Sequence, residues 1–423
     1  VKDAFTNLGE EDLGIIISNE VTPKGPVCSA HVCGRPAPTE TRKEEWTAEN
    51  PTLFLAQKDT GVGVVAEDDV YRVQLGIWRK PDGGSLYTRH FGLGPRASYT
   101  IEWSIYPVSP PDYWDFINAV RRDWNVNFTM DGPLEFSSAK FLTETPVEEL
   151  MKLDSQRGWR LVPISPWLDY WDGYGMTREE FANLVKPAIA KVKPANPNVV
   201  TFVCIEPPLR EVGPGELPDY IDSVPILSSG APSLDRPYQH EIPANLRLKG
   251  YAMYDVYPEV GNKRFREIMD YIDFAMDMCG YDGVYFDSFM GDCYGVHSTY
   301  DKWDGHTVDI DPKSFTVVRK YANLKLITGE ALKRFIEHIQ AKGGFVIANS
   351  QPPIRCMQNL RIYRFVECNA LEDVGHMQEW LTKTHLYTPI GLGYRLKPEE
   401  LTPENFMKDV RNHLEHGTLY YYY

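Results

Sequence analysis

The sequence lacks the features that mark several large classes of protein. No apolar run approaches the ~18 residues that a membrane-spanning helix needs, and the longest runs, Gly14–Ser18 and Val199–Ile205, have the length of strands. Basic residues are in the minority: 44 Lys and Arg stand against 59 Asp and Glu, which gives a net charge of −15. A surface of this sign repels phosphate backbones and anionic lipids, so we expect neither nucleic acid nor a membrane as a partner.

Sequence motifs of several enzyme classes are also missing. The chain contains neither the Gly-x-Ser-x-Gly motif of α/β-hydrolases nor the His-Glu-x-x-His motif of zinc peptidases, and its His residues are scattered. No Gly-x-Gly-x-x-Gly motif and no phosphate-binding Gly-Lys loop follows an early strand, which weakens a nucleotide-binding interpretation. We therefore predict no metal and no cofactor.

Cysteine is scarce, with 7 among 423 residues. Cys28 and Cys33 lie in a stretch rich in Pro and Gly, where we predict a small disulfide loop. Two free thiols, or a metal site that includes His31, are the alternatives. The odd count leaves at least one thiol unpaired, and Cys204 is expected to be buried in a strand.

We expect the protein to be secreted. The sequence starts at Val1 without a charged-then-apolar leader, which suggests a mature chain whose signal peptide is absent or removed. Asn127-Phe128-Thr129 is the one N-glycosylation sequon, so Asn127 is the predicted glycosylation site.

Length and composition indicate a globular protein of two domains. A single core rarely grows past roughly 250–300 residues, and this chain has 423. Hydrophobic residues make up 43% and charged residues 24%, which is ordinary globular composition. Aromatic residues reach 13%. That excess fits a sugar-binding surface, where flat rings stack on pyranose faces, and equally a large sandwich or barrel core.

Residues 1–110 have the pattern of an antiparallel β-sandwich. Short alternating runs recur between turn signals, without a convincing helix. The clearest are Leu13–Ile17, Val62–Ala66, Tyr71–Trp78 and Ser98–Tyr106. Residues 111–130 then contain an amphipathic stretch, Asp112–Asn125, which we predict to be a connector helix with one apolar stripe.

Residues 131–423 alternate between strand and helix patterns. Eight strands with intervening helices match a (β/α)8 barrel in count and length, and a doubly wound open sheet is the alternative. The predicted strands are Leu134–Leu142, Trp159–Trp167, Val199–Pro207, Gly283–Phe289, Phe345–Asn349, Ile362–Cys368, Thr388–Gly393 and Leu419–Tyr422.

Four acidic residues end apolar strands of this region, where the functional groups of such barrels lie: Asp169, Glu206, Asp287 and Glu367. Asp287 ends the strongly apolar run Gly283–Phe286, and an ionised group at that depth is costly unless it is paired or used. Glu367 ends a similar run. Two carboxylates that face each other across a barrel mouth can cleave a glycosidic bond, so Asp287 and Glu367 are the predicted catalytic pair.

Sugar-binding side chains are predicted around this pair. Aromatic rings that alternate with carboxylates after the strands can stack on a sugar and bind its hydroxyl pairs, and an Asn at a strand end can bind a further hydroxyl. The candidates are Trp167, Asp169, Trp171, Asp172, Glu206, Tyr254, Asp255 and Asn349.

With these residues identified, the chain resembles secreted glycoside hydrolases in which a β-sandwich precedes a catalytic (β/α)8 barrel. The sandwich exit, Gly92–Trp103, followed by an aromatic connector helix, is similar to that of the retaining, α-galactosidase-like α-glycosidases. The resemblance implies that Asp287, after the fourth barrel strand, is the nucleophile. It also implies that Glu367, on the sixth, is the acid/base. Where the family carries Lys or Trp two residues before the nucleophile, this chain carries Tyr285.

The predicted function is therefore hydrolysis of an oligo- or polysaccharide. Two other classes stay open: a carbohydrate-binding or structural assembly protein that has kept the fold without turnover, and a polysaccharide lyase with a Tyr or His base.

Overall fold

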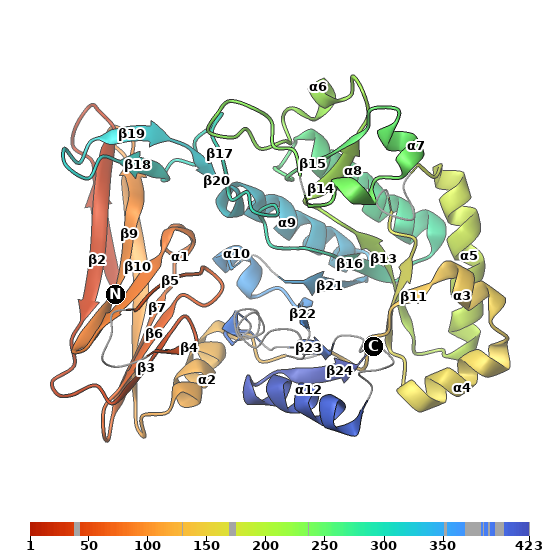
Figure 1. The fold of residues 1–423 in the computed structure, drawn as a ribbon, viewed down its shortest axis with the longest axis horizontal. Coiled ribbons are helices and arrows are strands. Elements are labelled where there is room, and N and C mark those ends of the chain that lie inside the picture. Colours follow the sequence, from red (N-terminus) through yellow and green to blue (C-terminus); the bar gives the residue numbers. More distant parts are fainter. Residues whose placement is uncertain are drawn as a thin grey trace.

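The computed structural model describes residues 1–37, 43–128, 130–168, 175–235, 237–350, 353–368, 382–383, 385–387, 390–393 and 402–422. Residues 43–46, 365–368, 390–393 and 419–422 are described by their backbone alone. An antiparallel sandwich forms the N-terminal part, and a parallel sheet with helices forms the rest (Figure 1). The boundaries predicted near residues 110 and 131 stay a prediction. None of the helices in the described ranges has the length and apolarity to cross a membrane.

Two antiparallel sheets make the sandwich. The larger has the order β1-β10-β7-β6-β3-β4, and the smaller has the order β2-β9-β8-β5. Apolar side chains on their facing sides, such as Val64, Ile77 and Leu86, form one core. The strands are β1 (Lys2–Thr6), β2 (Leu13–Val21), β3 (Ser29–Val32), β4 (Arg35–Ala37), β5 (Lys43–Trp46), β6 (Thr52–Ala56), β7 (Gly61–Ala66), β8 (Gly76–Lys80), β9 (Gly83–Leu93) and β10 (Ser98–Val108).

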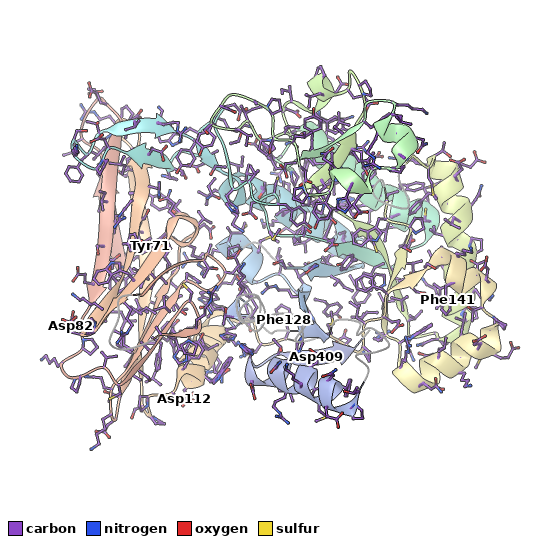
Figure 2. The ribbon with its side chains drawn as sticks, viewed as in Figure 1. Tyr71, Asp82, Asp112, Phe128, Phe141 and Asp409 are labelled. Atoms are coloured by element: carbon purple, nitrogen blue, oxygen red, sulfur yellow. The ribbon has the colours of Figure 1, made fainter. Side chains whose placement is uncertain are left out.

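The strand predicted at Tyr71–Trp78 is wrong in its first half. Residues Asp69–Gln74 form helix α1, and β8 begins only at Gly76. The carboxylate of Asp68 caps α1 by accepting from the Tyr71 amide at 2.9 Å, and this local bond outweighs the β preference of Val70 and Tyr71. The Tyr71 side chain lies inside the sandwich (Figure 2), where its hydroxyl donates to the Leu86 carbonyl at 2.8 Å.

The connector helix is α2 (Tyr113–Trp124), capped by Asp112. Its predicted apolar stripe is buried against strands β6 and β7 of the sandwich. Gly63 permits the close approach, because a Cβ there would lie 2.1 Å from the Phe116 ring. The other side of α2 faces residues 385–387, where Arg121 donates to the His385 carbonyl at 2.6 Å.

Eight parallel strands form the second sheet in chain order, from β11 to β24. The pairings run through neighbouring strands, and those of the described residues do not join β11 to β24. The strands are β11 (Ser137–Ser138), β12 (Leu161–Ser165), β13 (Val200–Ile205), β16 (Gly283–Phe286), β21 (Phe345–Asn349), β22 (Tyr363–Cys368), β23 (Ile390–Gly393) and β24 (Leu419–Tyr422). The first predicted strand, Leu134–Leu142, is therefore mostly wrong. Ser138 caps helix α3 instead, which cuts the strand to two residues.

Helices cover one face of this sheet. Alternate strand residues such as Val203, Val284 and Val346 pack on them, whereas Cys204, Tyr285 and Ile347 form a separate core on the other face. The helices are α3 (Ala139–Glu144), α4 (Val147–Arg157), α5 (Arg178–Ala195), α8 (Lys263–Asp273) with its π-helical continuation η3 (Phe274–Cys279), α9 (Leu324–Ala341), α10 (Arg355–Gln358) and α12 (Pro403–Glu415).

Two long excursions interrupt the alternation. The first follows β13 and contains β14 (Leu209–Val212), α6 (Leu217–Tyr220), η2 (Gln239–Glu241), α7 (Ala244–Arg247) and β15 (Ala252–Asp255). The second follows β16 and contains β17 (Ser298–Thr299), β18 (Val308–Ile310), β19 (Val317–Lys320) and β20 (Ala322–Asn323). The β18–β19 hairpin lies over the sandwich strands β2 and β9 (Figure 1), with Val308 packed against Gly92. The two parts of the chain therefore contact each other at sites well separated in sequence.

The disulfide predicted between Cys28 and Cys33 is wrong, because neither residue is part of a disulfide. Strand β3 occupies the four residues between them. An extended chain rises about 3.3 Å per residue, so the two Cα atoms lie about 16 Å apart, well beyond the reach of a disulfide. Cys204 is buried in β13, as predicted.

Acid is expected to weaken the contact between the sandwich and α2. The His31 ring stacks on Tyr113 at 4.2 Å, and burial lowers its pKa from 6.5 to about 4 despite the nearby Asp112. Because the folded pKa is the lower one, the unfolded chain binds the proton first, and stability is lost as the pH falls from 6.5 toward about 4. At roughly 1.4 kcal/mol per pH unit, this loss reaches about 3 kcal/mol.

Denaturant unfolding at several pH values measures this loss. His31→Phe keeps the stacking and removes the titration, so its unfolding free energy should fall less on acidification than that of the wild type. His240→Phe, at an exposed position, is the control and should follow the wild type. The prediction would be contradicted if the unfolding free energies of the wild type and His31→Phe fell by the same amount as the pH is lowered.

Candidate active site

Asp287 lies directly after β16, the fourth parallel strand, and its side chain is partly exposed. Its Oδ1 atom accepts three hydrogen bonds: 2.7 Å from Asn349 Nδ2, 2.9 Å from the Ser288 amide and 3.2 Å from the Tyr285 hydroxyl. Ser288 has a φ of +49°, a strained conformation for a residue with a Cβ. Three donors on one oxygen fix the orientation of the carboxylate and leave Oδ2 for other contacts.

Glu206 follows β13, the neighbouring strand, and only 3% of its surface is exposed. The Tyr294 hydroxyl donates to its Oε1 at 3.0 Å and also contacts the Ser288 hydroxyl. Ile205 lies beside Phe286 in the register of these strands, and the Asp287 amide donates to the Ile205 carbonyl at 2.9 Å, so the Glu206 and Asp287 carboxyls leave adjacent positions and interact with each other. Two acidic groups from adjacent strand ends therefore share one small volume.

The environment of this pair opposes double ionisation. Burial raises the pKa of Glu206 well above its ordinary value, and the negative charge of Asp287 raises it further. Desolvation also raises the pKa of Asp287, although its hydrogen-bond donors oppose that shift. Among the described residues, no Lys, Arg or His forms an ion pair with either carboxylate. The pair therefore holds a proton at a pH where isolated carboxylates have lost theirs.

Arg264 of α8 fixes the chain beside Glu206. Its buried guanidinium donates to the carbonyl oxygens of Glu206 at 2.6 Å, Pro207 at 3.1 Å and Leu209 at 3.0 Å. Its charge is balanced by Glu267 at 2.6 Å. Arg264 thus holds the backbone that carries Glu206 without neutralising the Glu206 carboxyl.

Aromatic rings pack around Tyr285, whose hydroxyl donates to Asp287. The rings of Trp167 and Phe136 both lie edge-on to the Tyr285 ring, with distances between ring centroids of 5.5 Å and 5.1 Å. A cavity of about 360 Å³ opens at the carboxyl ends of β11 to β13, and its lining combines rings with hydroxyl and carboxyl groups. It is lined by Glu135, Phe136, Ser137, Ser138, Phe141, Ser165, Trp167 and Cys204. Its chemistry suits a sugar, which needs an apolar face for its ring and polar partners for its hydroxyls.

Solved structures with this arrangement of sheets are known, although no family model and no curated protein matches the sequence. The α-galactosidase of Thermus thermophilus, solved with stachyose, aligns with a TM-score of 0.56 at 10% identity, over 99% of this chain and 90% of that one. The chain has the fold of the α-galactosidases. The resemblance predicted from the sequence is confirmed at that level.

Two further enzymes share the fold. The cycloalternan-degrading enzyme of Trueperella pyogenes aligns with a TM-score of 0.53 at 12% identity, over 100% of this chain and 61% of that one. The α-N-acetylgalactosaminidase of Bifidobacterium bifidum aligns with a TM-score of 0.50 at 10% identity, over 99% of this chain and 85% of that one. At these identities the likeness concerns the fold alone.

Several predicted site residues of this α-galactosidase fold come together. Asp287, Glu206 and Asn349 are in direct contact or share partners, and Trp167 lies against Tyr285. Asn349 donates to the carboxylate of Asp287, whereas the sequence analysis predicted that it binds a sugar hydroxyl. The backbone of Glu367 lies near the end of β22, and its side chain is outside the described residues.

The remaining candidates lie elsewhere or are not described. Tyr254 and Asp255 belong to β15 of the first excursion, where Tyr254 packs against a small apolar cluster that includes Val212 and Val256. Asp255 is buried and accepts from the Ser233 hydroxyl at 2.6 Å, and burial raises its pKa to about 6. No described contact links either residue to Asp287. The other three candidates, Asp169, Trp171 and Asp172, lie outside the described residues.

Sequence reasoning missed four residues that shape the site. Tyr285 was identifiable, because strand alternation puts it on the same face as Asp287. Ser288, Tyr294 and Arg264 carry no such signal, since they reach the site from a turn, an irregular loop and helix α8.

Proposed function

We propose that the protein is a retaining glycoside hydrolase that cleaves α-linked galactosides, or related α-glycosides, of an oligo- or polysaccharide. The observation that carries the proposal is Asp287, a partly exposed carboxylate held by three donors at the end of the fourth parallel strand. The shared fold supports the same conclusion, because T. thermophilus α-galactosidase was solved with stachyose and with an aryl α-galactoside. Fold alone does not set an activity, so the argument rests on the site.

In this proposal, Asp287 is the nucleophile and Glu367 the acid/base. Strand register supports the pairing: Phe286 lies beside Ala348, Ala348 lies beside Arg364, and Glu367 follows three residues later at the same end of the sheet. Only β21 separates the two strands, which puts their backbones about 10 Å apart. Side chains that extend inward from such positions can bring their carboxyl groups to the separation of ~5–5.5 Å that a retaining mechanism needs.

The reaction would have two balanced steps. Asp287 Oδ2 attacks the anomeric carbon while the glycosidic C–O bond breaks, and Glu367 gives its proton to the leaving oxygen. A water then attacks the same carbon, Glu367 takes its proton, and the Asp287 carboxylate is released. The two inversions leave the anomeric configuration of the product unchanged.

Three further features belong to the proposal. The parallel strands would close into the (β/α)8 barrel predicted from the sequence, with the cavity at the mouth formed by their carboxyl ends. The protein would be secreted, and Asn127, which is exposed, would carry a glycan.

Incubation with stachyose and with p-nitrophenyl α-D-galactopyranoside tests the function. We expect saturated products shortened by one hexose in mass spectra, and an α-configured product in the first minutes of an NMR time course. A β-configured first product would exclude the retaining mechanism. Unsaturated products would indicate a lyase, and binding without products would indicate a carbohydrate-binding protein.

A further inference from the structure

The contact between Glu206 and Asp287 is unusual for two acidic side chains. The two carboxyls come from adjacent strands, and the Asp287 amide donates to the Ile205 carbonyl at 2.9 Å, which holds the strand ends together. Neither carboxyl can move far, because Arg264 fixes the Glu206 backbone and three donors fix Asp287 Oδ1. Contact between two ionised carboxylates would be strongly repulsive in so buried a place, so one of them carries a proton.

The hydrogen bonds indicate which carboxyl carries it. Asp287 Oδ1 accepts from a backbone amide and a side-chain amide, and these groups can only donate, which favours an ionised Asp287. The partners of Glu206 are the hydroxyls of Tyr294 and Ser288, which can donate or accept and so tolerate a neutral acid. Glu206 is also the more deeply buried of the two. The proton therefore belongs on Glu206.

We propose that Glu206 is a positioning residue whose protonated carboxyl donates a hydrogen bond to Asp287 and holds the nucleophile in its attacking orientation. This inference rests on the proposed function, in which Asp287 attacks the sugar. The hydrogen bond would orient Oδ2 while the three donors orient Oδ1, so that both oxygens of the nucleophile are fixed. Because Glu206 is neutral, it would do this without repelling the charge on Asp287.

A different role for Glu206, as the proton donor to the leaving group, fits the geometry less well. A retaining pair stands about 5–5.5 Å apart because the sugar lies between the two carboxyls. Glu206 and Asp287 occupy adjacent positions on hydrogen-bonded neighbouring strands, only about 4.8 Å apart, and their carboxyls interact directly, so a sugar does not fit between them. A donor that serves the leaving group must come from farther away, as Glu367 would on β22.

Infrared difference spectroscopy of the protein without substrate tests the protonation directly. The wild type minus Glu206→Gln should show the C=O stretch of a protonated carboxyl at neutral pH. Glu49→Gln is a matched control, because Glu49 is buried too, and the Lys325 ammonium at 3.1 Å lowers the pKa of its carboxyl against the effect of desolvation. Its difference spectrum should show only carboxylate bands. This readout needs no turnover, so it decides the protonation state of Glu206 even if no glycoside is cleaved.

Kinetics with the two galactosides test the positioning role. Glu206→Gln keeps a neutral donor toward Asp287 and should retain about a tenth of the wild-type kcat. Glu206→Leu removes the donor and should lose at least about 100-fold in kcat with little change in KM. Both losses should be equal for stachyose and for the aryl galactoside, because positioning of the nucleophile does not depend on the leaving group. Circular dichroism checks that each variant is folded.

Two results would overturn the inference. The first is a Glu206→Gln difference spectrum without a protonated-carboxyl band, which would mean that Glu206 is ionised. The second is a Glu206→Gln enzyme that loses stachyose cleavage but keeps aryl galactoside cleavage, which would make Glu206 the proton donor. Absence of any turnover in the wild type would instead refute the proposed function and leave the spectroscopic result standing.

Discussion

Asp287→Asn is expected to lower kcat for stachyose by at least about 10⁴-fold. The amide has the shape of the carboxylate, so the site should stay assembled around Asn349, Tyr285 and the Ser288 amide. It cannot attack the anomeric carbon, because it has no negative charge and its nitrogen is a poor nucleophile. Initial rates measure the loss, and calorimetry with stachyose should still detect binding, since the wall at Trp167 is unchanged.

Asp311→Asn is the matched control. Asp311 is also partly exposed and accepts backbone amide bonds after a short strand, from Lys313 and Ser314, but it lies in the β18–β19 hairpin, away from the site. This variant should keep wild-type turnover. A fluorinated galactosyl donor should form an ester on Asp287 in the wild type, and mass spectrometry of the digested protein locates it. An active Asp287→Asn enzyme would move the nucleophile to another carboxylate of the site.

Most of the parallel sheet could be predicted because its strands are short apolar runs, and the segments between them repeat apolar residues with the period of a helix. The bounds of Phe345–Asn349 and Leu419–Tyr422 match β21 and β24. The errors lie where one polar side chain decides the backbone. Asp68 and Ser138 each cap a helix by accepting an amide bond, and each converts apolar residues with strand character into a helix.

The candidate site was predictable to the same degree. A carboxylate or amide that ends a buried strand is visible in the sequence, which is how Glu206, Asp287 and Asn349 were found. The contact between Glu206 and Asp287 was not, because it depends on β13 and β16 being neighbours. More than seventy residues separate these strands in the sequence. The predicted disulfide is wrong for a related reason: the spacing of two cysteines in the sequence does not reveal that an extended strand lies between them.

Lys325→Met is expected to destabilise the protein by about 3–5 kcal/mol. Lys325, in the first turn of α9, joins the sandwich to the loop after β16. Its ammonium contacts Glu49 at 3.1 Å, Asp292 at 3.0 Å and the Met290 carbonyl at 3.2 Å. Only 12% of its side chain is exposed, and Glu49 and Asp292 are similarly buried. Desolvation opposes the charge on Lys325, but the two carboxylates outweigh it and raise its pKa.

The size of this effect follows from what the substitution leaves behind. Without the ammonium, two carboxylates face each other in a buried place and keep only weaker cationic neighbours: His297, which contacts Asp292 at 2.7 Å, and Lys383 and Arg364, which interact with Glu49 without a described ion pair. Lys333→Met on the same helix is the control: Lys333 is 31% exposed and pairs with Glu337 at 3.4 Å, so its loss should cost less than about 1 kcal/mol. Urea unfolding curves give both values.

A triple variant separates charge from packing. Adding Glu49→Gln and Asp292→Asn to Lys325→Met removes the stranded carboxylates and should recover most of the lost stability, because neutral amides cost less to bury than unpaired charges. The single variant should also lower turnover, since Lys325 holds the Met290 carbonyl in the loop that continues from Asp287 and Ser288. If Lys325→Met unfolds at the same urea concentration as Lys333→Met, the ion pairs of Lys325 with Glu49 and Asp292 do not hold the sandwich to this loop.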